Sequence, residues 1–207
     1  MKRFALTGAM GLAVAAALMG CQHNDDHATV SGAQAHDGHA AIHAAGKTPD
    51  MAKPVTHAIA VMHPTQGNQA KGIVRFTQDG ENTVRVVAEL SGLTPNGKHG
   101  FHIHEFGDCS APDATSAGGH YNPEGHPHAG PDADHRHAGD MGNVQADGQG
   151  NAKLELTLKG ITVGSHPNPI LGRGVILHAK ADDLKSQPTG DAGGRIACGV
   201  IGAAKGQ

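Results

Sequence analysis

The chain has 207 residues, of which 38% are hydrophobic, with no Trp, one Tyr, four Phe and 31 Gly. Its formal net charge is −3, and the absence of a basic patch argues against nucleic acid as a partner. The length suits one domain with extra segments, and the composition indicates a modest aliphatic core joined by many turns.

The first twenty residues are typical of an export signal. Lys2 and Arg3 form a charged start, and residues 6–19 are apolar, rich in Ala and too short for a comfortable membrane span. Residues 18–21, Leu-Met-Gly-Cys, resemble a bacterial lipobox, which predicts that Cys21 is lipidated and becomes the mature N-terminus. An ordinary cleaved signal is the alternative. Loss of Lys2 and Arg3, with no acids, leaves a mature charge of about −5.

The segment after the signal predicts a His-rich flexible tether over residues 21–55. It is poor in large apolar groups and rich in Ala, His, Asp and Gly. Because Gln22 rather than Asp follows Cys21, the analogy with bacterial lipoproteins favours anchoring in the outer membrane, facing the periplasm. The histidines fit either a tail that collects copper or zinc or a solvated spacer. They are His23, His27, His36, His39 and His43.

From residue 56 onward the pattern is that of a β protein. Short apolar or alternating segments are separated by turn signals such as Asp79-Gly80 and Ser91-Gly92. No segment beyond the signal has a convincing helical period, which favours an all-β sandwich or barrel over residues 56–207. The predicted strands cover residues 56–62, 72–77, 83–90, 99–106, 151–158, 174–180 and 195–201.

Three long stretches, 107–142, 159–172 and 181–194, have no predicted strand. Loops of this length in a compact domain are usually functional or disordered. The first contains three histidines and one aspartate that are candidate ligands, the number and kind that a closed tetrahedral zinc site needs, and its glycines and prolines allow it to fold back on itself. A polar loop with scattered histidines is the alternative. The candidate ligands are His120, His128, His137 and Asp140, whereas His126 and His135 are not expected to be ligands.

Three more histidines lie in predicted strands. His102 and His104 are two residues apart, so their side chains share one face of a strand and can bind one ion. His178 ends an apolar strand, where an unpaired imidazole is costly to bury. A surface pair and a core histidine bonded to a carbonyl are the respective alternatives. Imidazole suits zinc and copper, and seven residues serve two four-ligand sites if one ligand is shared.

The cysteines agree with export. If Cys21 is lipidated, Cys109 and Cys198 remain, and in an oxidising periplasm they most simply form a disulfide. The bond would close a loop of about 90 residues and contribute up to about 4–5 kcal/mol.

Four motifs together resemble the copper–zinc superoxide dismutases. Residues 100–108, Gly-Phe-His-Ile-His-Glu-Phe-Gly-Asp, resemble the first signature of that family. Residues 119–123 and 136–140 resemble its metal loop, and residues 193–202 resemble its second signature. The resemblance covers roughly residues 56–204, and the signal and tail point to the bacterial periplasmic, lipoprotein type.

This resemblance implies a Greek-key barrel of about eight antiparallel strands with long metal-binding loops. The implied activity is an oxidoreductase reaction, the dismutation of superoxide to oxygen and hydrogen peroxide, with copper and zinc as cofactors. Copper performs the redox chemistry, because zinc has no second accessible oxidation state, and His120 bridges the two ions. The implied copper ligands are His102, His104, His120 and His178. The implied zinc ligands are His120, His128, His137 and Asp140.

Further roles are implied for residues around the metals. Asp182 would bond to His102 and His128 and fix their orientation. The disulfide would hold the metal loop to the barrel near Arg195. Because the mature chain is negative and superoxide is an anion, local positive charge must guide the substrate, and the resemblance assigns this to Arg195. The steering residues of the family do not carry over to the loop 181–194, where Lys185 is a further candidate.

Two other functions are possible on the same fold. One is a non-catalytic periplasmic copper or zinc buffer, and the other is a structural dismutase-like domain without copper. Intact metal ligands together with Arg195 favour the enzyme, because a buffer needs no anion-guiding arginine. The sequence leaves open whether the chain is a monomer or a homodimer.

Overall fold

The computed structural model describes residues 53–206, so the predicted signal, Cys21 and most of the tether lie outside the described residues. The described part contains eight strands and one short 3₁₀ helix. The elements are β1 (His57–Pro64), β2 (Lys71–Gln78), β3 (Thr83–Ser91), β4 (Lys98–His104), η1 (Thr115–Ala117), β5 (Asp140–Gln145), β6 (Ala152–Lys159), β7 (Gly174–His178) and β8 (Arg195–Ala203). Within residues 53–206, no helix is of the length and apolarity needed to span a bilayer.

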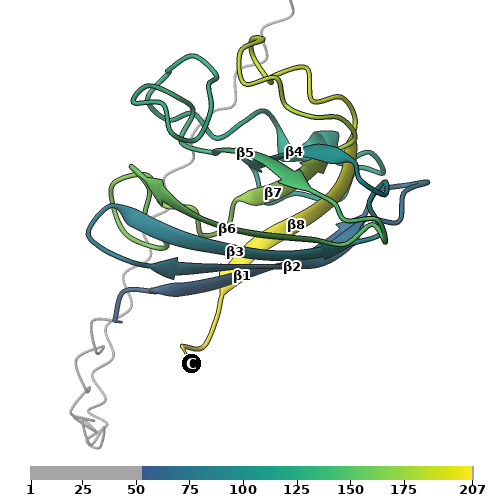
Figure 1. The fold of residues 1–207 in the computed structure, drawn as a ribbon. Coiled ribbons are helices and arrows are strands. Elements are labelled where there is room, and N and C mark those ends of the chain that lie inside the picture. Colours follow the sequence, from purple (N-terminus) through teal and green to yellow (C-terminus); the bar gives the residue numbers. More distant parts are fainter. Residues whose placement is uncertain (1–52, 207) are drawn as a thin grey trace, which may run out of the picture. The chain divides into compact units, whose positions relative to one another are not determined.

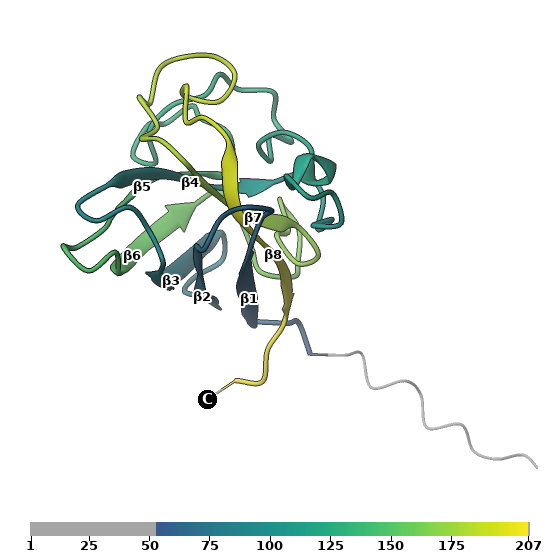
Figure 2. The same ribbon diagram turned by 90° about the vertical axis from the view of Figure 1, so that its right-hand side faces the viewer.

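The strands form one antiparallel sheet in the order β5-β4-β7-β8-β1-β2-β3-β6. The outer strands β5 and β6 also contact each other, so the sheet curls into a nearly closed barrel (Figures 1 and 2). Pairs such as β3 with β6 and β4 with β7 join strands that are not consecutive, which gives Greek-key connections. The predicted all-β Greek-key barrel of about eight strands is confirmed.

The barrel interior is filled by alternate residues of the strands. In β3, Val84, Val86, Ala88 and Leu90 are buried, whereas the residues between them are half-buried or exposed. Successive side chains of a strand point to opposite faces, so every second residue enters the core. Fully burying one aliphatic or aromatic side chain contributes about 1.5–3 kcal/mol, and this aliphatic core makes the barrel a rigid support for its loops.

The face of the barrel that carries the histidines arises from the same alternation in β4 and β7. Phe101 and Ile103 belong to the barrel core, so His102 and His104 point to the opposite, outer face. The β4–β5 pairing shifts between Gly100 and His102, and the β7–β8 pairing shifts at His178. Such irregularities re-aim side chains, and here they occur at histidines that gather on the outer face.

Two long connections lie over this outer face. Residues 105–139 and 179–194 appear on the same side of the barrel in both views (Figures 1 and 2). A small buried cluster beneath the first connection joins it to the sheet through Ile176 of β7 and Cys198 of β8. The loops therefore form a second layer that closes over the histidines.

The fifth strand corrects the prediction that a loop extends to residue 142. The segment Asp140–Gln145 pairs with β4 and begins at a candidate metal ligand. Its sequence shows no clear alternation of apolar and polar residues. Its backbone is also irregular, since Gly142 has φ 75° and the pairing with β4 shifts near His102. Pairing with β4, rather than local propensity, makes this segment a strand.

Candidate metal centre

Seven buried residues form two groups of potential metal ligands, each with its ligating atoms within 4.8 Å of one another. These are the residues that the sequence singled out, and His120 belongs to both groups. The first group is His102, His104, His120 and His178. The second group is His120, His128, His137 and Asp140.

In the first group, one ring nitrogen of each histidine is hydrogen-bonded and the other has no partner among the described residues. The bonded nitrogens are Nε2 of His102, at 2.7 Å from Asp182 Oδ2, and Nδ1 of His104, at 3.0 Å from Gly118 O. His178 Nδ1 lies 3.1 Å from the carbonyl oxygen of Gly193. With the N–H on the bonded nitrogen, the opposite nitrogen presents a lone pair.

Four buried lone pairs without a hydrogen-bond donor are costly unless something binds them. They belong to Nδ1 of His102 and to Nε2 of His104, His120 and His178. An all-imidazole set of this kind suits copper, so these residues fit the ion that the sequence implied.

The second group is arranged around the carboxylate of Asp140. Its Oδ1 lies 2.9 Å from His120 Nδ1, 3.0 Å from His128 Nδ1 and 3.4 Å from His137 Nδ1. A tetrahedral zinc with bonds of about 2.0–2.1 Å has ligand–ligand edges of about 3.3 Å, which these distances approach. Three nitrogens and one carboxylate oxygen therefore fit zinc.

Burial keeps the histidines of the first group neutral. It lowers the pKa of His120 to about 4 and of His178 to about 3, and it lowers the pKa of His104 well below its ordinary value. Because a ligating imidazole must be unprotonated, protons compete little for the nitrogens of His120 and His178 above roughly pH 5.

Around the second group, pairing between histidines and carboxylates affects the pKa values more than burial does. Burial lowers the pKa of His128, but hydrogen bonds to Asp140 and Asp182 outweigh it and raise that pKa to about 9. Burial raises the pKa of the two carboxyl groups, yet their histidine partners hold both pKa values well below the usual range. Both carboxyl groups are therefore carboxylates, ready to face a cation.

Asp182 contacts one histidine of each group, the two that the resemblance named for it. Its Oδ2 accepts from His102 Nε2 at 2.7 Å, and its Oδ1 accepts from His128 Nε2 at 2.9 Å. One buried carboxylate thus fixes a ring from each group. Gly190 makes room for it, because a Cβ at that residue would collide with the carboxylate and lie 2.7 Å from His128 Nε2.

Three residues that position the site were missed by sequence reasoning. Asn143 of β5 exchanges two hydrogen bonds with the backbone of Asp182, at 2.7 and 2.9 Å. Gln187 does the same for the backbone of His128, at 2.8 and 2.9 Å, and His99 Nδ1 lies 2.9 Å from His178 O. Each bond joins segments far apart in the chain, so no local pattern indicates them.

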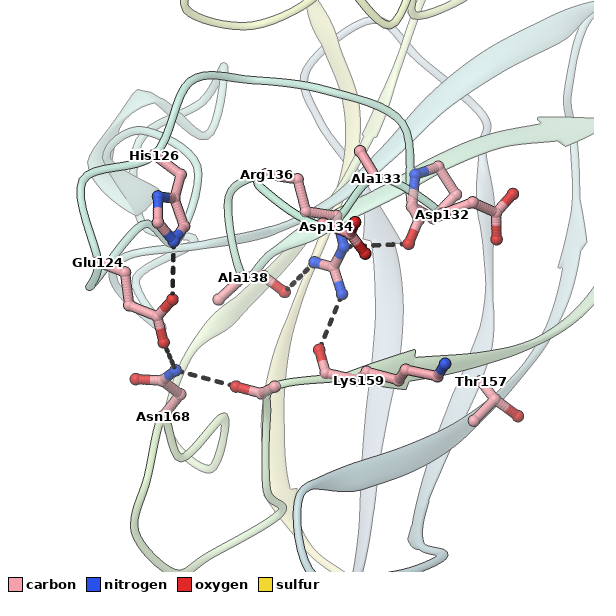
Figure 3. Close-up of a pocket in the computed structure, with 12 residues that line it drawn as sticks. Glu124, His126, Asp132, Ala133, Asp134, Arg136, Ala138, Thr157, Lys159 and Asn168 are labelled. Carbon is pink, nitrogen blue, oxygen red and sulfur yellow. Dashed lines mark hydrogen bonds and ion pairs between the residues drawn. The ribbon is translucent and has the colours of Figure 1, made fainter.

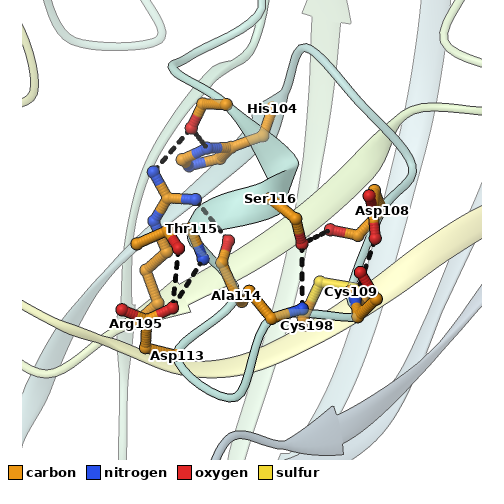
Figure 4. The surroundings of a disulfide bond; sticks show 12 residues. His104, Asp108, Cys109, Asp113, Ala114, Thr115, Ser116, Arg195 and Cys198 are labelled. Carbon is orange, nitrogen blue, oxygen red and sulfur yellow. Dashed lines mark hydrogen bonds between the residues drawn. A yellow bond between two sulfur atoms is a disulfide. The ribbon is translucent and has the colours of Figure 1, made fainter.

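Arg195 lies beside the first group (Figure 4). Its Nη1 and Nη2 donate to the carbonyls of Ala114 and Gly118, both at 2.5 Å. Gly118 O also bonds His104 Nδ1, so one carbonyl connects the guanidinium to a candidate copper ligand. Burial lowers the pKa of Arg195 from its ordinary value, yet an arginine stays charged. Two of the five N–H groups of its guanidinium hold the side chain in place, and the others can bind an anion.

A disulfide joins Cys109 of the loop to Cys198 of β8 (Figure 4), which confirms the predicted bond. Cys198 lies on the same strand as Arg195, so the bond attaches the loop that bears Ala114 and Gly118 to the strand that bears the guanidinium. His126 and His135 lie outside the two buried ligand groups, and Lys185 is exposed.

Comparisons with known proteins agree with this site. Residues 70–201 match the family model described as copper/zinc superoxide dismutase. The chain is 44% identical over 162 residues to the Cu-Zn superoxide dismutase of Paramecium bursaria Chlorella virus 1, covering 75% of this chain and 82% of the relative. It is also similar to a crystal structure titled as that of the clock protein EA4, with 42% identity, a TM-score of 0.67, and coverage of 73% and 97% of the two chains. The chain belongs to the copper/zinc superoxide dismutase family.

Proposed function

We propose that this enzyme removes superoxide in the periplasm, where it protects the exported compartment, and that a lipid on Cys21 anchors it to a membrane. The observation that carries the catalytic part is the shared histidine. His120 contributes Nε2 to an all-imidazole group, while its Nδ1 lies 2.9 Å from the carboxylate at the centre of the second group. Two adjacent sites joined by one imidazole are the arrangement that a copper–zinc pair requires.

The reaction is that of the family. The chain is a superoxide dismutase, an oxidoreductase that converts superoxide to oxygen and hydrogen peroxide with copper and zinc as cofactors. Copper supplies the one-electron redox chemistry when it is bound.

We assign the residues as follows. Copper is held by the first ligand group and zinc by the second. His120 Nε2 is the atom that holds a proton when it is not ligated, and its Nδ1, turned toward Asp140, keeps the ring in place. Arg195 binds the superoxide anion, because its fork is fixed beside His104 by the carbonyl of Gly118.

The first experiment is superoxide dismutation by the purified protein, with copper and zinc counted in the same sample. We expect fast activity with about one copper and one zinc per chain, the stoichiometry that two four-ligand sites predict. Full loading with both metals but no activity would contradict this and favour the buffer. The position of Arg195 already disfavours a buffer, which has no use for a fixed cation beside its metal.

Two observations support the compartment. Residues 1–21 have the pattern of a lipoprotein export signal, and the Cys109–Cys198 disulfide suits an oxidising environment. Expression in a bacterium with a labelled fatty acid tests the anchor. We expect label and membrane association for the wild type, and their loss together with a soluble periplasmic enzyme for Cys21→Ala. Label retained in Cys21→Ala would refute lipidation.

A homodimer is also proposed, through the surface around β1 and β8. Val61, Phe106 and Val200 are the large hydrophobic side chains left exposed in the described residues, at 48%, 57% and 43%. Val61 and Val200 line a groove whose lining includes no Asp, Glu, Lys or Arg, and a lack of charge is typical of interface cores. Sedimentation of the wild type and of Val200→Glu tests this. We expect a dimer that the substitution converts to a monomer, and a monomeric wild type would refute it.

A further inference from the structure

An exposed pair of side chains, His126 and Glu124, lies beside a pocket on the surface of the metal loop (Figure 3). His126 Nε2 is 3.0 Å from Glu124 Oε2, and both side chains are reachable from solvent. Asn122 clamps the turn that bears them, because its side chain exchanges hydrogen bonds with the backbone N–H and carbonyl of His126, at 3.0 and 2.8 Å. Asn168 Nδ2 donates to the other carboxylate oxygen at 2.7 Å. The pair is therefore held in place by two asparagines.

A second imidazole lies next to this pair. The ring of His135, which is exposed, has its centroid 4.9 Å from that of His126. Beside His126 is an open pocket of about 260 Å³, also lined by the carboxylates of Asp132 and Asp134. Two cationic side chains, Arg136 and Lys159, complete its charged lining, and Arg136 donates its N–H groups to backbone carbonyls. The ring of His126 thus borders a pocket in which three carboxylates outnumber the two cations.

We propose that His126, His135 and Glu124 bind a third divalent transition-metal ion, of the zinc class, distinct from the buried pair. Two imidazoles and a carboxylate are a ligand set that zinc accepts, with water in the fourth position. The ion replaces the hydrogen bond between His126 and Glu124. Among the described residues only the buried groups bring all ligating atoms within 4.8 Å, so His135 must turn its exposed ring toward the pair.

The position of the site gives it a consequence for the buried zinc. His126 precedes the candidate zinc ligand His128 by two residues, and His135 precedes His137 by two. An ion held by His126 and His135 therefore joins the two arms of the metal loop that carry those ligands. By linking these two segments at the surface, the ion would hold the metal loop closed and slow the release of the buried zinc.

Zinc binding to the holoenzyme tests the site. Protein carrying one copper and one zinc is titrated with ZnCl₂, and bound zinc is counted after equilibrium dialysis. The double variant His126→Asn/His135→Asn is compared with His63→Asn/His166→Asn, which removes two exposed histidines elsewhere. Histidines of residues 21–52 contribute equally to all three proteins. We expect the wild type and the control to bind one more zinc than the first double variant.

Equal zinc binding by all three proteins would overturn the proposal. If the double variant loses its buried metals, single substitutions at Glu124 and Asn168 still test the site. Glu124→Gln changes an exposed side chain, and we expect it to weaken the additional site at least tenfold while copper and zinc contents stay at one each. Asn168→Ala, which removes the bond that orients Glu124 together with a bond from the same amide to the carbonyl of Gly160, should weaken it about 10-fold or more. Unchanged affinity in both variants would refute the ligand assignment.

Discussion

Asp182 Oδ2 lies 2.7 Å from Nε2 of His102, a residue 80 positions earlier in the chain. The carboxylate belongs to the loop after β7, and the imidazole belongs to β4 inside the barrel sheet. Both side chains are fully buried. The second oxygen of Asp182 bonds His128 of the metal loop, so this one carboxylate joins the barrel, both long loops and both ligand groups.

Substitution of Asp182 by Asn should therefore weaken both metal sites. An amide replaces one of the two carboxylate oxygens with an NH₂ donor, so either His102 or His128 loses the oxygen that accepts its N–H. Loss of a group that orients ligands costs about 10–100-fold in metal affinity, and we expect a loss in this range measured by competition with chelators. Asp183→Asn is the matched control, because that carboxylate is exposed and bonds the backbone of Lys185 and Ser186. Equal affinities in the two variants would remove Asp182 from this role.

Gly190→Ala should also disturb the carboxylate of Asp182, by steric contact. Gly190 has φ 66°, and an added Cβ would displace Asp182 and crowd His128. A strained backbone of this kind costs about 1–3 kcal/mol, which for a domain of this size lowers the melting temperature by about 2–4 °C per kcal/mol. Gly194→Ala is the control, because a Cβ there meets no atom within 4 Å. Calorimetric scans of both variants check this, and similar shifts would contradict it.

Arg195→Ala should preserve both metals and reduce the dismutation rate. Electrostatic guidance raises association rates by about 10–1000-fold and fades with salt, so we expect a loss of at least about tenfold at low salt and a weaker dependence on ionic strength. Arg75→Ala removes the same charge from β2, where Arg75 faces Glu89, and should behave like the wild type. An unchanged low-salt rate with full metal content would exclude Arg195 from the mechanism.

Removal of the disulfide should destabilise the domain and loosen the loop beside Arg195. Cys109 and Cys198 are separated by 89 residues, and closing a loop of this length is worth up to about 4–5 kcal/mol in the chain-entropy model. We expect Cys109→Ser/Cys198→Ser to unfold at lower denaturant concentration. Faster amide exchange at Ala114 and Gly118 should accompany it, because their segment loses its covalent attachment. Exchange that is unchanged there would show that packing on Ile176 alone holds the loop.

Much of the fold could be read from local patterns. Apolar alternation in Thr83–Ser91 and apolar runs such as Gly174–His178 are imposed by a two-faced sheet, and these strands appear close to where they were predicted. Strand β5 was missed, since Gly142 interrupts its alternation and only pairing with β4 defines it. The predicted strands 99–106 and 174–180 extended too far, because the chain leaves the sheet and enters the long loops directly after His104 and His178.

For the site, the sequence by itself identified the residues that the fold gathers into two groups of potential metal ligands. Spacing in a strand places His102 and His104 on one face, and residue types alone indicate nitrogen and oxygen ligands for two ions. The tertiary structure decided what no spacing encodes: which nitrogen of each ring is bonded, that Asn143 and Gln187 fix the loops, and that His126 approaches Glu124 and His135. Ligand identity is a property of single side chains, whereas orientation depends on hydrogen bonds between segments that only folding brings together.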